Sequence, residues 1–222
     1  MMKTVFKILT LSSLLWLPLH AEVKHFTTID EAVNTFIKAV EEGDKALLEA
    51  LFTEKYKVIV DEKDIDREDA KAFLAKFKES HALVTRDDKE IYIGVGTSGW
   101  TFPIPLYEST EGWHFDINVG IENIKTRAIG RNELALIEAL HAGVDYQSLK
   151  SSSLSDIYLF LLPIDESLDI VALPKEYKKN AIMSFIRTKE GKVLEADLQE
   201  KVYQFSEAFK VVHQDYTDSK NK

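Results

Sequence analysis

Cysteine is absent from the 222 residues, and its absence removes several explanations at once. The fold contains no disulfide, no thiol is available as a catalytic nucleophile, and no cysteine can carry a lipid anchor. The sequence also lacks the Gly-x-Ser-x-Gly turn that presents a catalytic serine in many hydrolases. Nucleophilic catalysis therefore has no recognisable residue set here.

Long hydrophobic runs are missing too. The main apolar run covers residues 8–19 and follows a short positive segment with Lys3 and Lys7. A membrane-spanning helix needs about 20 apolar residues, whereas this shorter layout, closed by a small residue, is typical of a secretory signal peptide. We expect residues 1–21 to be a signal peptide that is cleaved between Ala21 and Glu22. The mature protein would then be periplasmic or secreted, without a membrane span.

Positive charge is in short supply. The chain has 28 basic and 37 acidic residues, and the expected leader contains two of the basic and none of the acidic ones. The mature chain would thus carry 26 basic and 37 acidic residues, a net charge of −11. Such a chain repels phosphate backbones and anionic lipid surfaces. We expect no nucleic-acid partner; an envelope protein, a small ligand or a second copy of the chain stays open.

The residues that are present predict an α+β protein. Thr28 and Glu31 form a capping box that predicts a helix start, Gly43 predicts its end, and Asp44 can cap a second helix. A short β segment is expected at residues 56–60, and a third helix is expected after Asp66.

Residues 90–117 change to an apolar–polar alternation that is interrupted by two turns. This pattern predicts a three-stranded antiparallel meander with one buried face. Its middle strand contains Pro103 and Pro105, which lack N–H groups, so we expect an edge or a bulge there. N-terminal helices packed on a curved antiparallel sheet are the predicted core.

The second half predicts more helix and then more strand. Residues 121–149 have helical spacing, with a break expected at Gly130 and a new helix from Asn132. A polar linker or domain boundary is expected at 148–155. Four β segments follow, at residues 157–162, 168–173, 181–187 and 193–196, and a final helix is expected at 198–209. The predicted organisation is a core domain at 22–149, a β-rich extension at 150–215 packed on that core, and a flexible tail at 216–222.

Three strings in the middle of the chain are shared with a known family: residues 100–106 (WTFPIPL), 112–116 (GWHFD) and 129–134 (IGRNEL). With the leader and the paired opening helices, they resemble an exported bacterial family known only as "domain of unknown function 2950". The resemblance covers roughly residues 25–147 and is weaker at 170–175 and 181–198. Typical members carry a long glycine- and tyrosine-rich insert after the third string, and this chain has only a short replacement.

The family resemblance implies a class and a location, and no reaction. By analogy alone, paired helices on a curved antiparallel sheet are similar to the cystatin or nuclear-transport-factor-2 cone, which serves enzymes and binding proteins alike.

One candidate ligand site consists of Arg127, Arg131, Asn132 and Glu133. If a helix begins at Arg131 or Asn132, its free N–H groups favour an anion, and the two guanidinium groups can clamp it. The structural alternative is that Asn132 caps the helix while Arg127 and Glu133 form an ion pair.

A candidate partner surface consists of Tyr92, Tyr107 and His114. Strand alternation places them on the face opposite Trp100 and Trp113, and it assigns the two tryptophans to the core. If the three residues align across the meander, they form an exposed patch for a peptide or a glycan.

A metal site is not favoured by the sequence. Glu138, His141 and Asp145 have the spacing of one helical face, but such a set occurs once, and His141 is better explained as a core residue. The glycine spacing of residues 94–99 leads into a strand and not a helix, which argues against a dinucleotide. We expect no metal and no other cofactor.

Three hypotheses for function follow. The favoured one is a non-catalytic binding or accessory protein of the cell envelope. The second is an enzyme that uses His114 or His141 with nearby carboxylates on an unknown envelope substrate, although no catalytic residue can be assigned. The third is a structural protein that self-associates through the edge strand containing Pro103 and Pro105.

Overall fold

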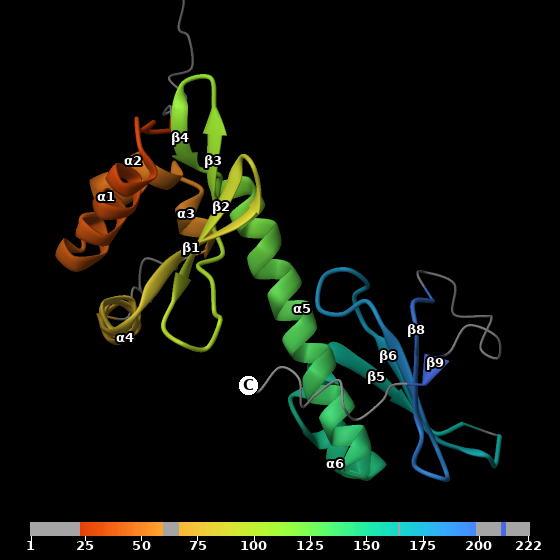
Figure 1. Ribbon diagram of the computed structural model, residues 1–222. Coiled ribbons are helices and arrows are strands. Elements are labelled where there is room, and N and C mark those ends of the chain that lie inside the picture. The colour runs from red at the N-terminus through yellow and green to blue at the C-terminus, as the bar shows by residue number, and fades with distance from the viewer. Residues whose placement is uncertain (1–22, 60–66, 164, 199–209, 212–222) are drawn as a thin grey trace, which may run out of the picture.

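Two α+β lobes are joined by one long helix, α5 (Ile117–His141), in the computed structural model (Figure 1). The structure describes residues 23–59, 67–163, 165–198 and 210–211. The first lobe contains four helices: α1 (Ile29–Glu42), α2 (Lys45–Phe52), α3 (Tyr56–Ile59) and α4 (Arg67–Glu79). Its antiparallel sheet has the order β1-β2-β3-β4, with bounds His81–Asp87, Glu90–Val95, Leu106–Ser109 and Gly112–Phe115.

In its described residues, the second lobe contains an antiparallel sheet and two short helices, α6 (Tyr146–Ser151) and α7 (Leu154–Ile157). Its strand order is β5-β6-β7-β8-β9, with bounds Tyr158–Leu161, Leu168–Pro174, Ser184–Thr188, Val193–Ala196 and Lys210–Val211. The first four strands confirm the four predicted β segments to within a few residues. The predicted leader, the predicted final helix beyond Leu198 and the predicted tail lie outside the described residues. The short strand β9 lies between the last two.

Local signals in the opening helices were correctly identified. The Thr28 hydroxyl accepts a hydrogen bond from the Glu31 N–H at 3.2 Å, and the Glu31 carboxylate accepts one from the Thr27 N–H at 3.3 Å. Gly43 ends α1 in the left-handed conformation at φ 63°, and the Asp44 side chain caps α2. The β segment predicted at 56–60 is wrong, because residues 56–59 form helix α3.

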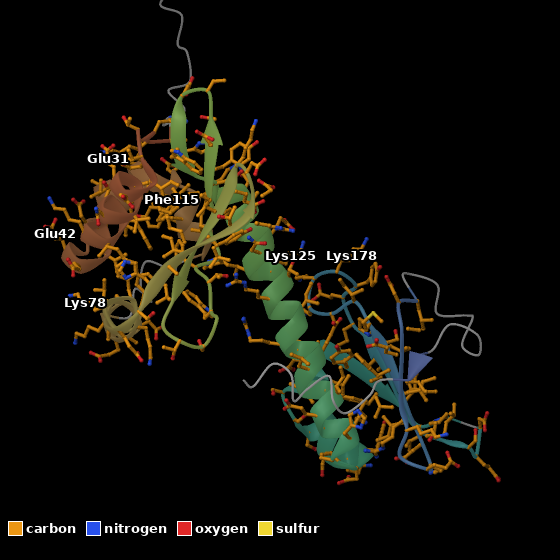
Figure 2. The ribbon with its side chains drawn as sticks, viewed as in Figure 1. Glu31, Glu42, Lys78, Phe115, Lys125 and Lys178 are labelled. Atoms are coloured by element: carbon orange, nitrogen blue, oxygen red, sulfur yellow. The ribbon has the colours of Figure 1, made fainter. Side chains whose placement is uncertain are left out.

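The first hydrophobic core lies between the helices and one face of the first sheet, which we call the front face. Ile91, Ile93 and Val95 of β2 point to this face. Phe36, Phe52 and Phe115 meet there with ring centroids 5.2–5.7 Å apart, and Figure 2 shows Phe115 between α1 and the sheet. Helices packed on an antiparallel sheet confirm the predicted fold class, and the cone comparison stays an analogy.

The meander differs from its prediction in two ways. Its middle strand is regular only as β3, because residues 100–105 run beside β2 with a single bridge between Thr101 and Gly94. Asn123 of α5 donates to the Pro103 carbonyl at 2.9 Å, and Pro105 is fully buried. The edge predicted for self-association is therefore covered by α5. The structure also adds β1, which the sequence analysis did not predict.

Helix α5 is continuous through Gly130, so the predicted break is wrong. The Asp116 side chain caps it by accepting from the N–H groups of Asn118 and Val119 at 3.0 and 3.1 Å. Its first half packs on the first lobe, and its second half packs on the second sheet through a core that includes Leu136 and Leu140. The polar run at 148–155 is mostly helical, in α6 and α7, and is not a linker. Among the described helices, none combines the length and the apolar character that crossing a membrane requires.

Candidate functional site

Tyr107 and His114 lie directly opposite each other on the back face of the first sheet, the face away from α1 and α2. Their rings form an edge-to-face contact with centroids 6.0 Å apart. Tyr107 is 37% exposed, and Glu90 lies opposite it on the next strand. Two of the three residues predicted to form a partner surface are therefore adjacent across the meander.

His25 joins these two residues and was not predicted. Its ring centroid lies 4.8 Å from that of His114, and its Nε2 lies 3.5 Å from a carboxylate oxygen of Glu111. The position of His25 follows from an antiparallel bridge next to it, in which Phe26 and Trp113 exchange hydrogen bonds of 2.8 and 2.9 Å. We call His25, Tyr107 and His114 the aromatic row.

Gly112 makes the bridge possible. It has a φ of 115°, and a Cβ at this position would lie 2.5 Å from the Phe26 carbonyl oxygen. A larger residue would force residue 26 away from β4. The sequence offered one signal for this close approach, the glycine within the GWHFD string.

The surroundings of His114 disfavour its protonated form. Burial lowers the pKa of His114, and the neighbouring His25 lowers it further, against smaller opposing effects from Gly112, Asp116 and Glu111. The His114 Nδ1 atom is buried and has no hydrogen-bond partner among the described residues. An imidazole in this position resists protonation.

We expect the free energy of unfolding to fall as the pH drops below about 6.5, the ordinary pKa of a histidine. A histidine with a lowered folded pKa binds fewer protons in the folded state than in the unfolded state. Its stabilising contribution is therefore complete above the unfolded pKa and is lost as the pH falls through that value towards the folded pKa. The side chain is partly solvated, so the loss should stay below about 1 kcal/mol.

Urea denaturation of the wild type and of His114→Gln between pH 5 and pH 7.5 measures this contribution. The variant should show a shallower fall, because His25, Glu111 and Asp116 stay in place in both proteins. Equal slopes would show that His114 does not titrate as expected.

Tyr92 lies on the back face, as predicted. The exposure predicted for it is wrong, because Tyr92 is buried beneath α5. Its hydroxyl donates to the Glu90 carboxylate at 2.5 Å and accepts from the Asn123 amide at 3.0 Å. Arg86 lies 3.5 Å from the same carboxylate. Tyr92 therefore belongs to the packing between the sheet and α5.

Arg127 fixes the next turn of α5 to the same face. Its guanidinium donates to the Thr101 carbonyl at 2.6 Å and to the Thr101 hydroxyl at 2.9 Å. Burial lowers the pKa of Arg127, Tyr92 opposes this shift, and Arg131 one turn away adds to it. The structure thus brings Arg127 close to Tyr92, a member of the other candidate set.

Asn132 and Glu133 contact the second lobe. The Asn132 amide donates to the Asn180 carbonyl at 2.8 Å, and the Glu133 carboxylate accepts from the N–H groups of residues 182 and 183, both at 2.8 Å. Asn132 lies inside a continuous helix and is not a cap, which corrects both interpretations of this cluster. The free helix N-terminus that favoured an anion is absent there, and binding by Arg127 and Arg131 stays a prediction.

His141, the histidine of the possible metal site, lies at the C-terminal end of α5. His141 is the last residue of that helix, whereas Asp145 caps α6, so Glu138, His141 and Asp145 do not share one helical face. Across the described part of the chain, no group of three or more histidine, aspartate and glutamate residues is placed to hold a metal ion. His114 lies on β4 of the first lobe and His141 lies at the end of α5 in the second, and catalysis by either of them stays a prediction.

These observations define a two-lobed α+β protein with a partly exposed aromatic row on the sheet of its first lobe. The chain belongs to the family described as "Protein of unknown function (DUF2950)", whose model matches residues 23–156. The match covers the first lobe and α5 and ends within α7, before the strands of the second sheet. No curated protein and no solved structure matches the chain.

Proposed function

We propose that the protein is exported and acts as a non-catalytic binding protein of the cell envelope, which holds a sugar ring of an envelope glycan against Tyr107. The observation that carries the proposal is the cross-strand alignment of Tyr107 with His114, flanked by His25 and Glu111. A partly exposed phenol ring offers an apolar face and a polar edge. The neighbouring imidazole and carboxylate groups can bind the hydroxyl groups of a sugar.

The backbone around the aromatic row favours a glycan over a peptide. A peptide commonly binds a sheet by adding a strand to an open edge. The edge of β4, next to the row, already pairs with Phe26. A ligand at the aromatic row therefore contacts side chains and not free backbone groups. Stacking of a sugar ring on Tyr107 fits this surface better than the addition of a peptide strand.

Charge narrows the glycan class. The mature chain would carry a net charge of −11, which disfavours polymers rich in phosphate. We choose peptidoglycan as the envelope glycan for the test, because its sugar backbone carries no phosphate.

The test expresses the full chain with its own leader in a bacterial host and incubates the periplasmic protein with purified peptidoglycan sacculi. We expect an intact mass that corresponds to a chain beginning at Glu22, and we expect this protein to co-sediment with the sacculi. Tyr107→Ala should raise the dissociation constant for the sacculi about fivefold, because an aromatic contact contributes about 1 kcal/mol.

Trp100→Ala is the matched control. Trp100 was predicted to lie in the core, but it is 45% exposed, and it contacts Phe73 of α4, a helix of the front face. Its removal should leave binding unchanged. Three results would each contradict the proposal. They are an intact mass that corresponds to a chain beginning at Met1, a protein that does not co-sediment with the sacculi, and equal binding by the wild type and Tyr107→Ala.

A further inference from the structure

β1 is an edge strand in which all seven residues are exposed. Leu83 and Val84, neighbours on opposite faces of the sheet, are 46% and 44% exposed. Within the described part of the chain, β1 pairs with β2 alone. Its outer edge therefore presents backbone N–H and C=O groups that another strand can pair with.

The usual protection of an edge strand is absent from most of β1. Natural edges are blunted by lysine, proline or a bulge. Residues 81–85 contain no lysine, no proline and no other permanently charged residue. The register shift lies between Thr85 and Asp87, at the end of the strand. A regular stretch of five residues is thus open, in contrast to β4, whose edge Phe26 covers.

We propose that β1 pairs antiparallel with β1 of a second copy of this chain, on a two-fold axis at Leu83. This register places Leu83 opposite Leu83 of the second copy, Ala82 opposite Val84, and His81 opposite Thr85. It uses all five regular residues and leaves the bulge outside. Both exposed aliphatic side chains gain an apolar neighbour from the second copy, as an isologous interface requires.

Charge supports a second copy as the occupant. Residues 76–79, just before β1, carry Lys76, Lys78 and Glu79, a net charge of +1. Residues 86–90, after its regular part, carry two basic and three acidic residues, a net charge of −1. Antiparallel pairing brings the two kinds of end together, so the charges of the two copies are weakly complementary. Both lysine side chains are more than 60% exposed, so they can approach a further carboxylate beside their present partners.

The symmetry has a consequence for the aromatic row. Residues that face each other in an antiparallel pair lie on the same side of the sheet. The back faces of the two copies therefore continue into one another, and both aromatic rows lie on the same side of an eight-stranded sheet. If the proposed function holds, the dimer binds two sites of one glycan, which raises its apparent affinity. The dimer itself does not depend on that function.

Disulfide trapping tests the register, because the chain has no cysteine of its own. Leu83→Cys places the two new thiols directly opposite each other, within the range of Cα distances that a disulfide allows. We expect most of this variant to form a covalent dimer under mild oxidation. In the Val84→Cys variant the two thiols are diagonal neighbours across the strand pair, roughly 7–8 Å apart. This variant should therefore form at least about fivefold less covalent dimer than Leu83→Cys.

Leu162→Cys controls for random collision, since Leu162 lies on the second lobe and is more exposed, at 62%. Dominant trapping of either Val84→Cys or Leu162→Cys would overturn the proposed interface.

Sedimentation equilibrium of the cysteine-free protein supplies an independent measurement. Two paired strands bury less surface than a standard interface, so we expect a dimer that dissociates in the micromolar range. Leu83→Lys should raise the dissociation constant at least about tenfold without unfolding the protein, because the side chain is exposed. A wild type that stays monomeric at about 100 µM, or a dimer that Leu83→Lys leaves unchanged, would refute the proposal.

Discussion

Replacement of Arg187 by methionine is expected to lower the free energy of unfolding by about 3 kcal/mol. Arg187 is 6% exposed and lies on β7. Its guanidinium forms a two-bond pair with Asp169 at 2.6 and 2.7 Å. It also donates to the carbonyl groups of Leu140 and Val144 at 3.2 and 2.8 Å, at the end of α5.

The large loss of stability is expected because the substitution leaves several polar groups without their hydrogen-bond partner. Methionine fills much of the volume but donates no hydrogen bond. The carbonyl groups of Leu140, in the last turn of α5, and of Val144, just beyond it, therefore lose a cationic partner at the negative end of the helix dipole. Asp169 would also lose its main partner. Burial raises the pKa of Asp169, and the hydrogen bonds and charge of Arg187 outweigh that effect and hold it below its ordinary value.

Urea denaturation of Arg187→Met measures the loss, and Lys189→Met is its control. Lys189 contacts the other oxygen of Asp169 at 3.4 Å, but its side chain is 57% exposed. An exposed ion pair contributes little, so the control should change stability by less than about 0.5 kcal/mol. Equal losses in the two variants would show that Arg187 acts only as one more surface charge.

The contacts of Arg187 are also an example of what local sequence patterns cannot predict. Its partners lie 18, 43 and 47 positions away, on another strand and at the end of a helix. No periodicity connects such positions, because only the register of β6 with β7 and the packing of α5 bring them together. The caps at Thr28 and Asp44 were predictable for the opposite reason, since each acts on the backbone three residues along.

The candidate site was predictable to the extent that it depends on strand alternation. Tyr107 and His114 share a face because the side chains of neighbouring strands alternate with a period of two. The position of His25 depends on a long-range bridge, and the burial of Tyr92 depends on the path of α5. Neither could be read from local pattern. β1 was missed because its residues are exposed on both faces and therefore show no alternation of burial.

Gly120→Ala and Gly130→Ala are expected to change stability in opposite directions, although both substitutions lie in the same helix. A Cβ at residue 120 would lie 2.5 Å from the Ile104 Cγ1 atom and 3.2 Å from its Cα. Ile104 is buried, so its backbone and side chain cannot move away at low cost. We expect a loss of about 1–3 kcal/mol for Gly120→Ala.

A Cβ at residue 130 would meet nothing within 4 Å. Alanine removes backbone freedom from the unfolded chain and favours the helix, so Gly130→Ala should raise the free energy of unfolding by about 0.5–1 kcal/mol. Urea denaturation of the two variants compares them directly, each serving as the control for the other. A change of the same sign in both would contradict the packing of Ile104 against α5.

The opposite signs would also explain why the break that the sequence predicts at Gly130 does not occur. Gly130 weakens the helix by backbone entropy alone, and packing of α5 on both lobes overcomes that weakness. Gly120 is the glycine that the fold requires, because only a residue without a side chain lets α5 approach residues 101–104 closely enough for Asn123 and Arg127 to bond to that segment.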